Sequence, residues 1–283
     1  MHNRLGDPHQ AKECYDRALA IRLKKLGPEH VHVANTYNNL GYVHSNLGNL
    51  QQANEYFDRA LAINLKKLGT EHVDVAETYH NLGVVHAGKE YHDRALAICL
   101  EKLGPEHVDV AKTYNSLGDV HRKLGNLQQA KEYHDRALAI RLEKLGPEHV
   151  DVAKTYNSLG DVHRKLGNLQ QAKEYHDRAL AIRLEKLGPE HVDVAKTYNS
   201  LGGLHRKLGN LQQAKEYHDR ALAICLEKLG PEHVDVAKTY NSLGDVHRKL
   251  GNLQQAKEYH DRALAIRLEK LGPEHVDVAK NLQ

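Results

Sequence analysis

Residues 146–187 read GPEHVDVAKTYNSLGDVHRKLGNLQQAKEYHDRALAIRLEKL, and the same pattern recurs along most of the 283-residue chain. Residues 104–145 and 230–271 are identical to this stretch. Residues 188–229 differ from it only at Gly203, Leu204 and Cys225. A fixed period of about 20–50 residues is typical of solenoids, propellers and other arrays. We therefore expect stacked repeat units in place of one globular core.

The tetrapeptide Gly-Pro-Glu-His, or Gly-Thr-Glu-His at Gly69, marks the start of each unit and divides the chain. The expected segments are 1–26 (the second helix of a partial repeat), 27–68, 69–103 (a shortened repeat), 104–145, 146–187, 188–229, 230–271 and 272–283 (the start of a further repeat). Solenoids usually need polar capping elements, and neither end carries one. We therefore expect a segment of a longer protein. Two alternatives to a binding function are a structural array that self-associates through the uncapped ends, and a sensor arm of a larger multidomain signalling protein.

The spacing of apolar residues predicts two helices in each unit. Two series of positions step by three and four residues, as one face of a helix does: Val152, Tyr156, Leu159, His163 and Leu166, then Ala172, His176 and Ala179. Gly167 is expected to end the first helix, and Asn168 to cap the second through its side chain. The sequence thus predicts an all-α fold of antiparallel pairs, whose first and second helices are called A and B below.

The unit at 69–103 is seven residues shorter than its neighbours, and the missing residues include the turn between helices A and B. Two structures fit this deletion. Helices A and B fuse into one bent helix, or Gly88 makes a tighter turn. An error in the gene model is a third explanation.

The repeat resembles the tetratricopeptide repeat. The matching positions are Tyr156, Leu159, Gly160, His163, Ala172, His176 and Ala179. His163 and His176 depart from it, because the family usually has Tyr and Phe there. The 42-residue period resembles the repeats of kinesin light chains and nephrocystin-3, in which Pro is typical where this chain has Val150. The resemblance implies a right-handed superhelical solenoid that binds proteins or peptides, with no cofactor.

Histidine is abundant, with 22 residues, and His149, His163 and His176 invite a metal-site interpretation. The second and third occupy core positions of the repeat, so we expect packing and no metal site. An active site needs one unique constellation of groups, whereas the reactive groups here recur in identical arrays. We therefore expect no enzymatic activity. Half-buried histidines suggest a mild sensitivity of stability to pH.

The resemblance assigns the concave face to helix A, which predicts a peptide-binding groove. In residues 146–187 its lining is Lys154, Asn157, Ser158, Asp161, Arg164 and Lys165. The equivalent positions are Lys112, Asn115, Arg122, Lys123, Lys196, Asn199, Arg206, Lys207, Lys238, Asn241, Arg248 and Lys249. Asn157 is expected to clamp a peptide backbone, since an amide both donates and accepts hydrogen bonds. Three cations against one anion predict a basic groove for extended acidic peptides. The alternative is an ordinary solvated face.

The first two units lack this charge pattern. Their groove positions are Asn35, Asn38, Asn39, Tyr42 and Ser45, then Glu77, His80, Asn81 and Val84. We expect acidic ligands to be attracted less strongly there.

The composition excludes several classes of partner. Lys and Arg number 40 against 37 Asp and Glu, for a net charge of +3, with both signs interspersed. Neither a nucleic acid nor a membrane surface is an expected partner, and no apolar run is long enough to span a bilayer. Three cysteines do not form a disulfide framework, which predicts a reducing, cytoplasmic setting. Cys99 and Cys225 align with Arg141 and Arg183, so we expect that position to be exposed.

Overall fold

The computed structural model describes residues 8–86, 88–272 and 278. Within these residues the regular secondary structure is entirely helical, which confirms the all-α prediction. The A helices are α2 (Val31–Asn46), α4 (Val73–His86), α6 (Val108–Lys123), α8 (Val150–Leu166), α10 (Val192–Leu208) and α12 (Val234–Lys249). The B helices are α1 (Pro8–Leu26), α3 (Leu50–Leu68), α5 (Lys89–Leu103), α7 (Leu127–Leu145), α9 (Leu169–Leu187), α11 (Leu211–Leu229) and α13 (Leu253–Leu271). Residues 1–7 of the expected partial repeat, and nearly all of 273–283, lie outside the described residues.

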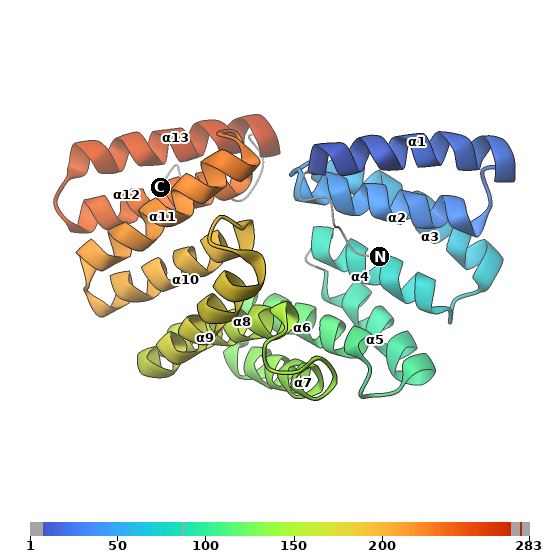
Figure 1. The fold of residues 1–283 in the computed structure, drawn as a ribbon, viewed down its shortest axis with the longest axis horizontal. Coiled ribbons are helices and arrows are strands. Elements are labelled where there is room, and N and C mark those ends of the chain that lie inside the picture. Colours follow the sequence, from blue (N-terminus) through green and yellow to red (C-terminus); the bar gives the residue numbers. More distant parts are fainter. Residues whose placement is uncertain (1–7, 87, 273–277, 279–283) are drawn as a thin grey trace. The chain divides into compact units, whose positions relative to one another are not determined.

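The chain forms two compact units, Met1–Ile140 and Arg141–Gln283. In the second unit each A helix packs along the B helix that follows it, as α12 and α13 do in Figure 1. Each B helix then packs on the next A helix, so α9 contacts α10 and α11 contacts α12. Helix α10 also contacts α8 and α12 directly. The first unit repeats this scheme, with α2 against both α3 and α4.

Helices A and B approach closely where a glycine of A faces a ring of B. A Cβ atom added at Gly160 would lie 2.6 Å from the ring of His176, which is fully buried. In the unit at 27–68 the same place is taken by Gly41 and Phe57. His163, at the end of α8, is also buried and stacks on Tyr175 at 5.4 Å between ring centroids. The expectation that both histidines fill the core is confirmed.

At the helix ends one predicted side-chain cap is absent, and one cap that was not predicted is present. Asn168 precedes α9 but makes no capping hydrogen bond, so the predicted cap is wrong; its amide lies 3.5 Å from His163 Nδ1. His149 begins α8, and its Nδ1 accepts a hydrogen bond from the Asp151 amide at 3.1 Å. Gly167 ends α8 at φ +91°, a left-handed conformation that favours glycine.

The shortened unit keeps two separate helices. Helix α4 ends at His86 and α5 begins at Lys89, with Gly88 in an extended conformation between them. The Gly88 amide donates a hydrogen bond to the Gly83 carbonyl at 3.2 Å. The tighter turn at Gly88 is therefore correct and the fused helix is wrong. Ala87 lies outside the described residues.

The position shared by arginine and cysteine is buried, which corrects the prediction that it is exposed. Cys99, Cys225, Arg141 and Arg183 are all less than 5% exposed. The Arg183 guanidinium reaches from α9 to α10, where Nη1 donates to the Asp193 carbonyl at 2.9 Å and to Thr197 Oγ1 at 2.6 Å. An arginine is tolerated there because the next A helix supplies acceptors for its charge.

Because it bonds this buried arginine, Thr197 should contribute more to stability than its counterpart Thr113, which lies on the helix that follows Cys99. Both hydroxyls donate to the carbonyl four residues earlier, but only Thr197 also accepts from a guanidinium. We expect Thr197→Val to lower the free energy of unfolding by about 1–3 kcal/mol, since a buried charged donor loses its acceptor. Thr113→Val is expected to cost about 1 kcal/mol or less. Urea unfolding of both variants measures the difference, and equal losses would contradict a specific role for the arginine.

Candidate functional site

The residues predicted to bind a ligand lie on α6, α8, α10 and α12. Their spacing of three, four and seven positions places them on one side of each helix. In the unit Arg141–Gln283, α10 contacts both α8 and α12, so the three faces adjoin. We call the predicted positions on α8, α10 and α12 together the A-helix face.

Lysines provide the exposed positive charge of this face. The exposed lysines are Lys154, Lys165, Lys196, Lys207, Lys238 and Lys249. Lys196 and Lys238 form ion pairs of 2.8 and 2.7 Å with an aspartate one turn earlier, yet their side chains are 55% and 63% exposed. Lys207 reaches the preceding repeat and donates to the Arg164 carbonyl at 2.7 Å. On α6, Lys123 is exposed and Lys112 is half-buried.

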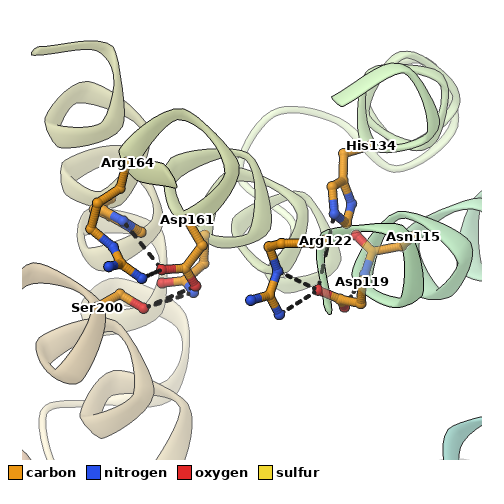
Figure 2. Close-up of polar contacts among 9 residues, drawn as sticks. Asn115, Asp119, Arg122, His134, Asp161, Arg164 and Ser200 are labelled. Carbon is orange, nitrogen blue, oxygen red and sulfur yellow. Dashed lines mark hydrogen bonds and ion pairs between the residues drawn. The ribbon is translucent and has the colours of Figure 1, made fainter. Parts of the chain in front are cut away.

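The arginines of the predicted set pair with aspartates of the same register. Arg164 Nη2 lies 3.0 Å from Asp161 Oδ1, and Ser200 of α10 donates to the other oxygen of Asp161 at 3.4 Å (Figure 2). Arg206 pairs with Asp245 of the next repeat at 2.9 Å. Part of the positive charge expected from the sequence is therefore offset locally.

The same pairing of arginine with aspartate occurs on α6, in the compact unit Met1–Ile140. On α6, Arg122 Nη2 lies 3.1 Å from Asp119 Oδ1, and the two side chains point toward one another in Figure 2. At the far end of the second unit, Arg248 lies 3.9 Å from Asp245 and its side chain is 63% exposed.

The asparagines mainly connect helices of this protein. Asn157 donates to Ser200 Oγ at 3.2 Å, and Asn199 donates to Thr239 Oγ1 at 2.8 Å. Asn241 Oδ1 lies 3.2 Å from His260 Nδ1. Asn115 is 1% exposed, and Ser158 is 9% exposed. The backbone clamp stays a prediction for the half-buried asparagines, and it does not extend to Asn115, whose side chain is covered.

One register of the A helices varies between repeats, and the prediction of the site from sequence did not use its change at Gly203. It carries Tyr42 and Val84 in the first two units, and aspartate in the third, fourth and sixth. The fifth unit has Gly203. Tyr42 and Val84 are 51% and 52% exposed, so the first two units present apolar groups where later ones present a carboxylate. The alignment of repeats contained this signal.

Two B-helix histidines lie beneath this register and are held neutral. Burial lowers the pKa of His176 to about 4, although Asp161 Oδ1 lies 4.0 Å from its Nε2 and favours the charged form. Burial likewise lowers the pKa of His218 to about 4, and the nearby Arg206 adds to this effect. His218 Nδ1 lies 2.9 Å from Asn199 Oδ1. Its Nε2 has no hydrogen-bond partner.

Burial makes the two buried thiols unreactive, and the histidines do not gather into metal-ligand clusters among the described residues. Burial raises the pKa of Cys99 and of Cys225 to about 11, so both are protonated at neutral pH and are poor nucleophiles. Within residues 8–86, 88–272 and 278, no three His, Cys, Asp or Glu side chains come together as metal ligands would.

Across the part of the chain that the structure describes, no helix is long and apolar enough to cross a bilayer.

Comparison with known proteins gives one family. The sequence profile of the tetratricopeptide repeat matches residues 1–66, 33–90, 86–143, 109–185, 151–227, 193–269 and 235–283. These overlapping matches span the whole chain. No curated protein sequence matches it.

Several solved structures share the fold. The apo form of RapI superposes with a TM-score of 0.66 at 20% identity, over 93% of this chain and 92% of that one. A chain of the APC/C hetero-tetramer Cut9–Hcn1 gives 0.64 at 18% identity, over 96% of this chain and 45% of that one. A point variant of a putative kinesin light chain from Podospora anserina, with nearly identical repeats, gives 0.51 at 23% identity, over 74% and 98%.

Proposed function

The chain belongs to the tetratricopeptide repeat family of protein-interaction scaffolds, and we propose that its A-helix face binds extended acidic peptide segments. The observation that carries the proposal is the direct stacking of α8, α10 and α12, each with two exposed lysines at the same positions. A chain that lies along this face meets the same positive groups once per repeat. Complementary charge steers such partners and favours them over neutral or basic ones.

The two units differ in what they offer such a ligand. The lysines at these positions have Asn35 and Glu77 as their counterparts in the first two repeats, and the aspartate register there carries Tyr42 and Val84. Helix α6 of the unit Met1–Ile140 carries the same lysines, but only in the unit Arg141–Gln283 do three A helices with this pattern stack. We therefore propose residues 141–283 as the main site for the acidic ligand. The cytoplasmic setting expected from the sequence stays a prediction.

Binding of fluorescently labelled peptides to the purified chain tests the proposal. Three extended peptides of equal length, one acidic, one neutral and one basic, are titrated at low and at high salt. We expect only the acidic peptide to bind, and we expect salt to weaken it, because exposed charges are screened over about 10 Å at 0.1 M salt.

A matched pair of variants locates the site. Lys154, Lys196 and Lys238 are changed together to Gln, and the control changes Lys144, Lys186 and Lys228, which lie on B helices. We expect the first variant to lose about tenfold in affinity, since exposed ion pairs contribute about 0.5 kcal/mol each. The control is expected to bind like the unchanged protein. Equal losses in both would indicate non-specific attraction by overall charge.

Sedimentation of the same protein tests the alternative function, a self-assembling structural array. If no peptide binds and the molecular mass rises with concentration, a self-assembling structural array becomes the better explanation.

A further inference from the structure

We propose that Gly203 fixes the register of a bound acidic segment, because a ligand carboxylate takes the place that an aspartate fills in the neighbouring repeats. The inference rests on the proposed function and deepens it. Near-identical repeats would otherwise hold a ligand in several positions, each shifted by one unit. A single departure from the repeat on the A-helix face gives one position a preference over the others.

The sequence isolates this departure. Residues 188–229 and 146–187 differ only at 203, 204 and 225. The change at 204 replaces one buried aliphatic side chain by another, and Cys225 is 2% exposed on α11. Only position 203 changes the chemistry of the A-helix face, and it removes the half-buried carboxylate that Asp161 and Asp245 carry in the repeats on either side.

The neighbouring repeats show what that carboxylate does. Asp245 pairs with Arg206 of the preceding repeat at 2.9 Å and lies 3.9 Å from Arg248 of its own helix. It also lies 3.9 Å from His260 Nε2 on the B helix beneath. The aspartate of this register therefore sits among two guanidinium groups and an imidazole.

At Gly203 the corresponding guanidinium groups and the neutral imidazole remain, and the carboxylate between them is gone. A Cβ atom added at Gly203 would lie 3.9 Å from Arg164 Cζ and Nη1, so this guanidinium of the preceding repeat covers the glycine. Arg206 follows three residues later on the same helix face. Arg164 Nε and His218 Nε2 are both buried without a hydrogen-bond partner. His218 is 1% exposed and occupies the place of His260.

The nearest aspartates of this register lie in the repeats on either side. Arg164 holds Asp161 on its own helix, and Arg206 holds Asp245 on α12. The predicted ligand positions of repeat 188–229 consequently carry three cations, Lys196, Arg206 and Lys207, and no anion. Their ion-pair partners lie outside these positions of the repeat, since Lys196 pairs with Asp193 and Arg206 with Asp245. A ligand carboxylate at Asp161 or Asp245 meets a like charge, whereas at Gly203 it meets guanidinium donors that favour planar, charge-assisted hydrogen bonds.

Two substitutions at this one position separate charge from space. Gly203→Asp restores the residue of the neighbouring repeats. Gly203→Ala adds a methyl group that fits, because 3.9 Å from Arg164 is ordinary van der Waals contact. With the labelled acidic peptide at low salt, we expect Gly203→Asp to weaken binding about tenfold and Gly203→Ala to stay within about twofold. Circular dichroism melts of both proteins confirm that they are folded.

Photo-crosslinking then reads the register. The acidic peptide carries benzoylphenylalanine at its centre, and trypsin releases residues 197–206 as TYNSLGGLHR. The equivalent fragments 113–122, 155–164 and 239–248 all read TYNSLGDVHR, so mass spectrometry distinguishes them from it. We expect crosslinks mainly on TYNSLGGLHR. In Asp161→Gly the fragment 155–164 becomes TYNSLGGVHR, and we expect it to gain crosslinks as a second register.

The outcomes distinguish the two proposals. If the unchanged protein binds no acidic peptide, the proposed function fails and this inference fails with it. If it binds with salt sensitivity but Gly203→Asp binds equally well, or if crosslinks fall evenly on both kinds of fragment, only the inference about Gly203 is overturned.

Discussion

We expect acidification from pH 7 to pH 5 to lower the free energy of unfolding by about 2 kcal/mol for each of His92, His176 and His218. Burial lowers the pKa of all three from 6.5 to about 4. The folded protein therefore binds fewer protons than the unfolded chain between these values. Stability is full above pH 6.5, falls as the pH drops toward 4, and changes no further through these groups below that.

The carboxylates contribute little between pH 7 and pH 5. Ordinary aspartate and glutamate side chains titrate near pH 4 and lose their ion pairs only below pH 5. The pKa values of His44, His121, His205 and His247 are lowered as well, again by burial, and they add to the loss in the same direction. The loss of stability between pH 7 and pH 5 should therefore come from the histidines.

The chain supplies its own control substitution. Phe57 occupies the place of these histidines in the unit 27–68 and is 1% exposed, so a phenyl ring fits over the facing glycine. Replacing His92, His176 and His218 together by Phe should remove most of the loss between pH 7 and pH 5. Urea unfolding at a series of pH values measures it. A flat curve for the unchanged protein would show that the buried imidazoles are not held neutral.

The second large effect comes from two adjacent glycines of α10 that should respond to alanine with opposite signs. A Cβ atom at Gly202 would lie 2.6 Å from the ring of His218, whereas at Gly203 the nearest group is Arg164 at 3.9 Å. We expect Gly202→Ala to lower the free energy of unfolding by about 1–3 kcal/mol, because the close-packed core is overfilled. Gly203→Ala should raise it by about 0.5–1 kcal/mol, the usual gain within a helix.

Urea midpoints of the two single variants test this contrast. A double-mutant cycle with His218→Ala tests its cause, since removing the ring should abolish most of the cost of Gly202→Ala. If Gly202→Ala proves as favourable as Gly203→Ala, helix A and helix B are further apart than the structure places them.

Much of the fold could be predicted from the sequence because its signals are local and repeated. The series Val152, Tyr156 and Leu159 steps at helical spacing, and Gly167 ends the helix for a reason internal to the backbone. A repeated pattern also identifies which residues form the core, since His176 occupies the position at which its sister repeats also have a buried ring.

The candidate site was predictable only in part. The register of Lys154 and Lys196 on one helix side follows from the period, and both side chains are exposed. The pairing of Arg206 with Asp245, and of Asn199 with Thr239, joins residues about forty positions apart. Charge counting along one repeat treats each arginine as available to a ligand, whereas Arg164 pairs with an aspartate of its own helix and Arg206 with one of the adjoining repeat.

The helical period, the order of the helices and the faces that pack together follow from the amino-acid sequence alone, because these depend on neighbours within a few residues along the chain. Packing between helices adds that Arg183 is buried, that Asn168 turns away from its cap, and that His176 closes over Gly160. Each of these depends on how near the next helix lies and on which acceptors it offers. A polar side chain is buried where a packed neighbour satisfies its hydrogen bonds, and spacing along one helix does not contain that distance.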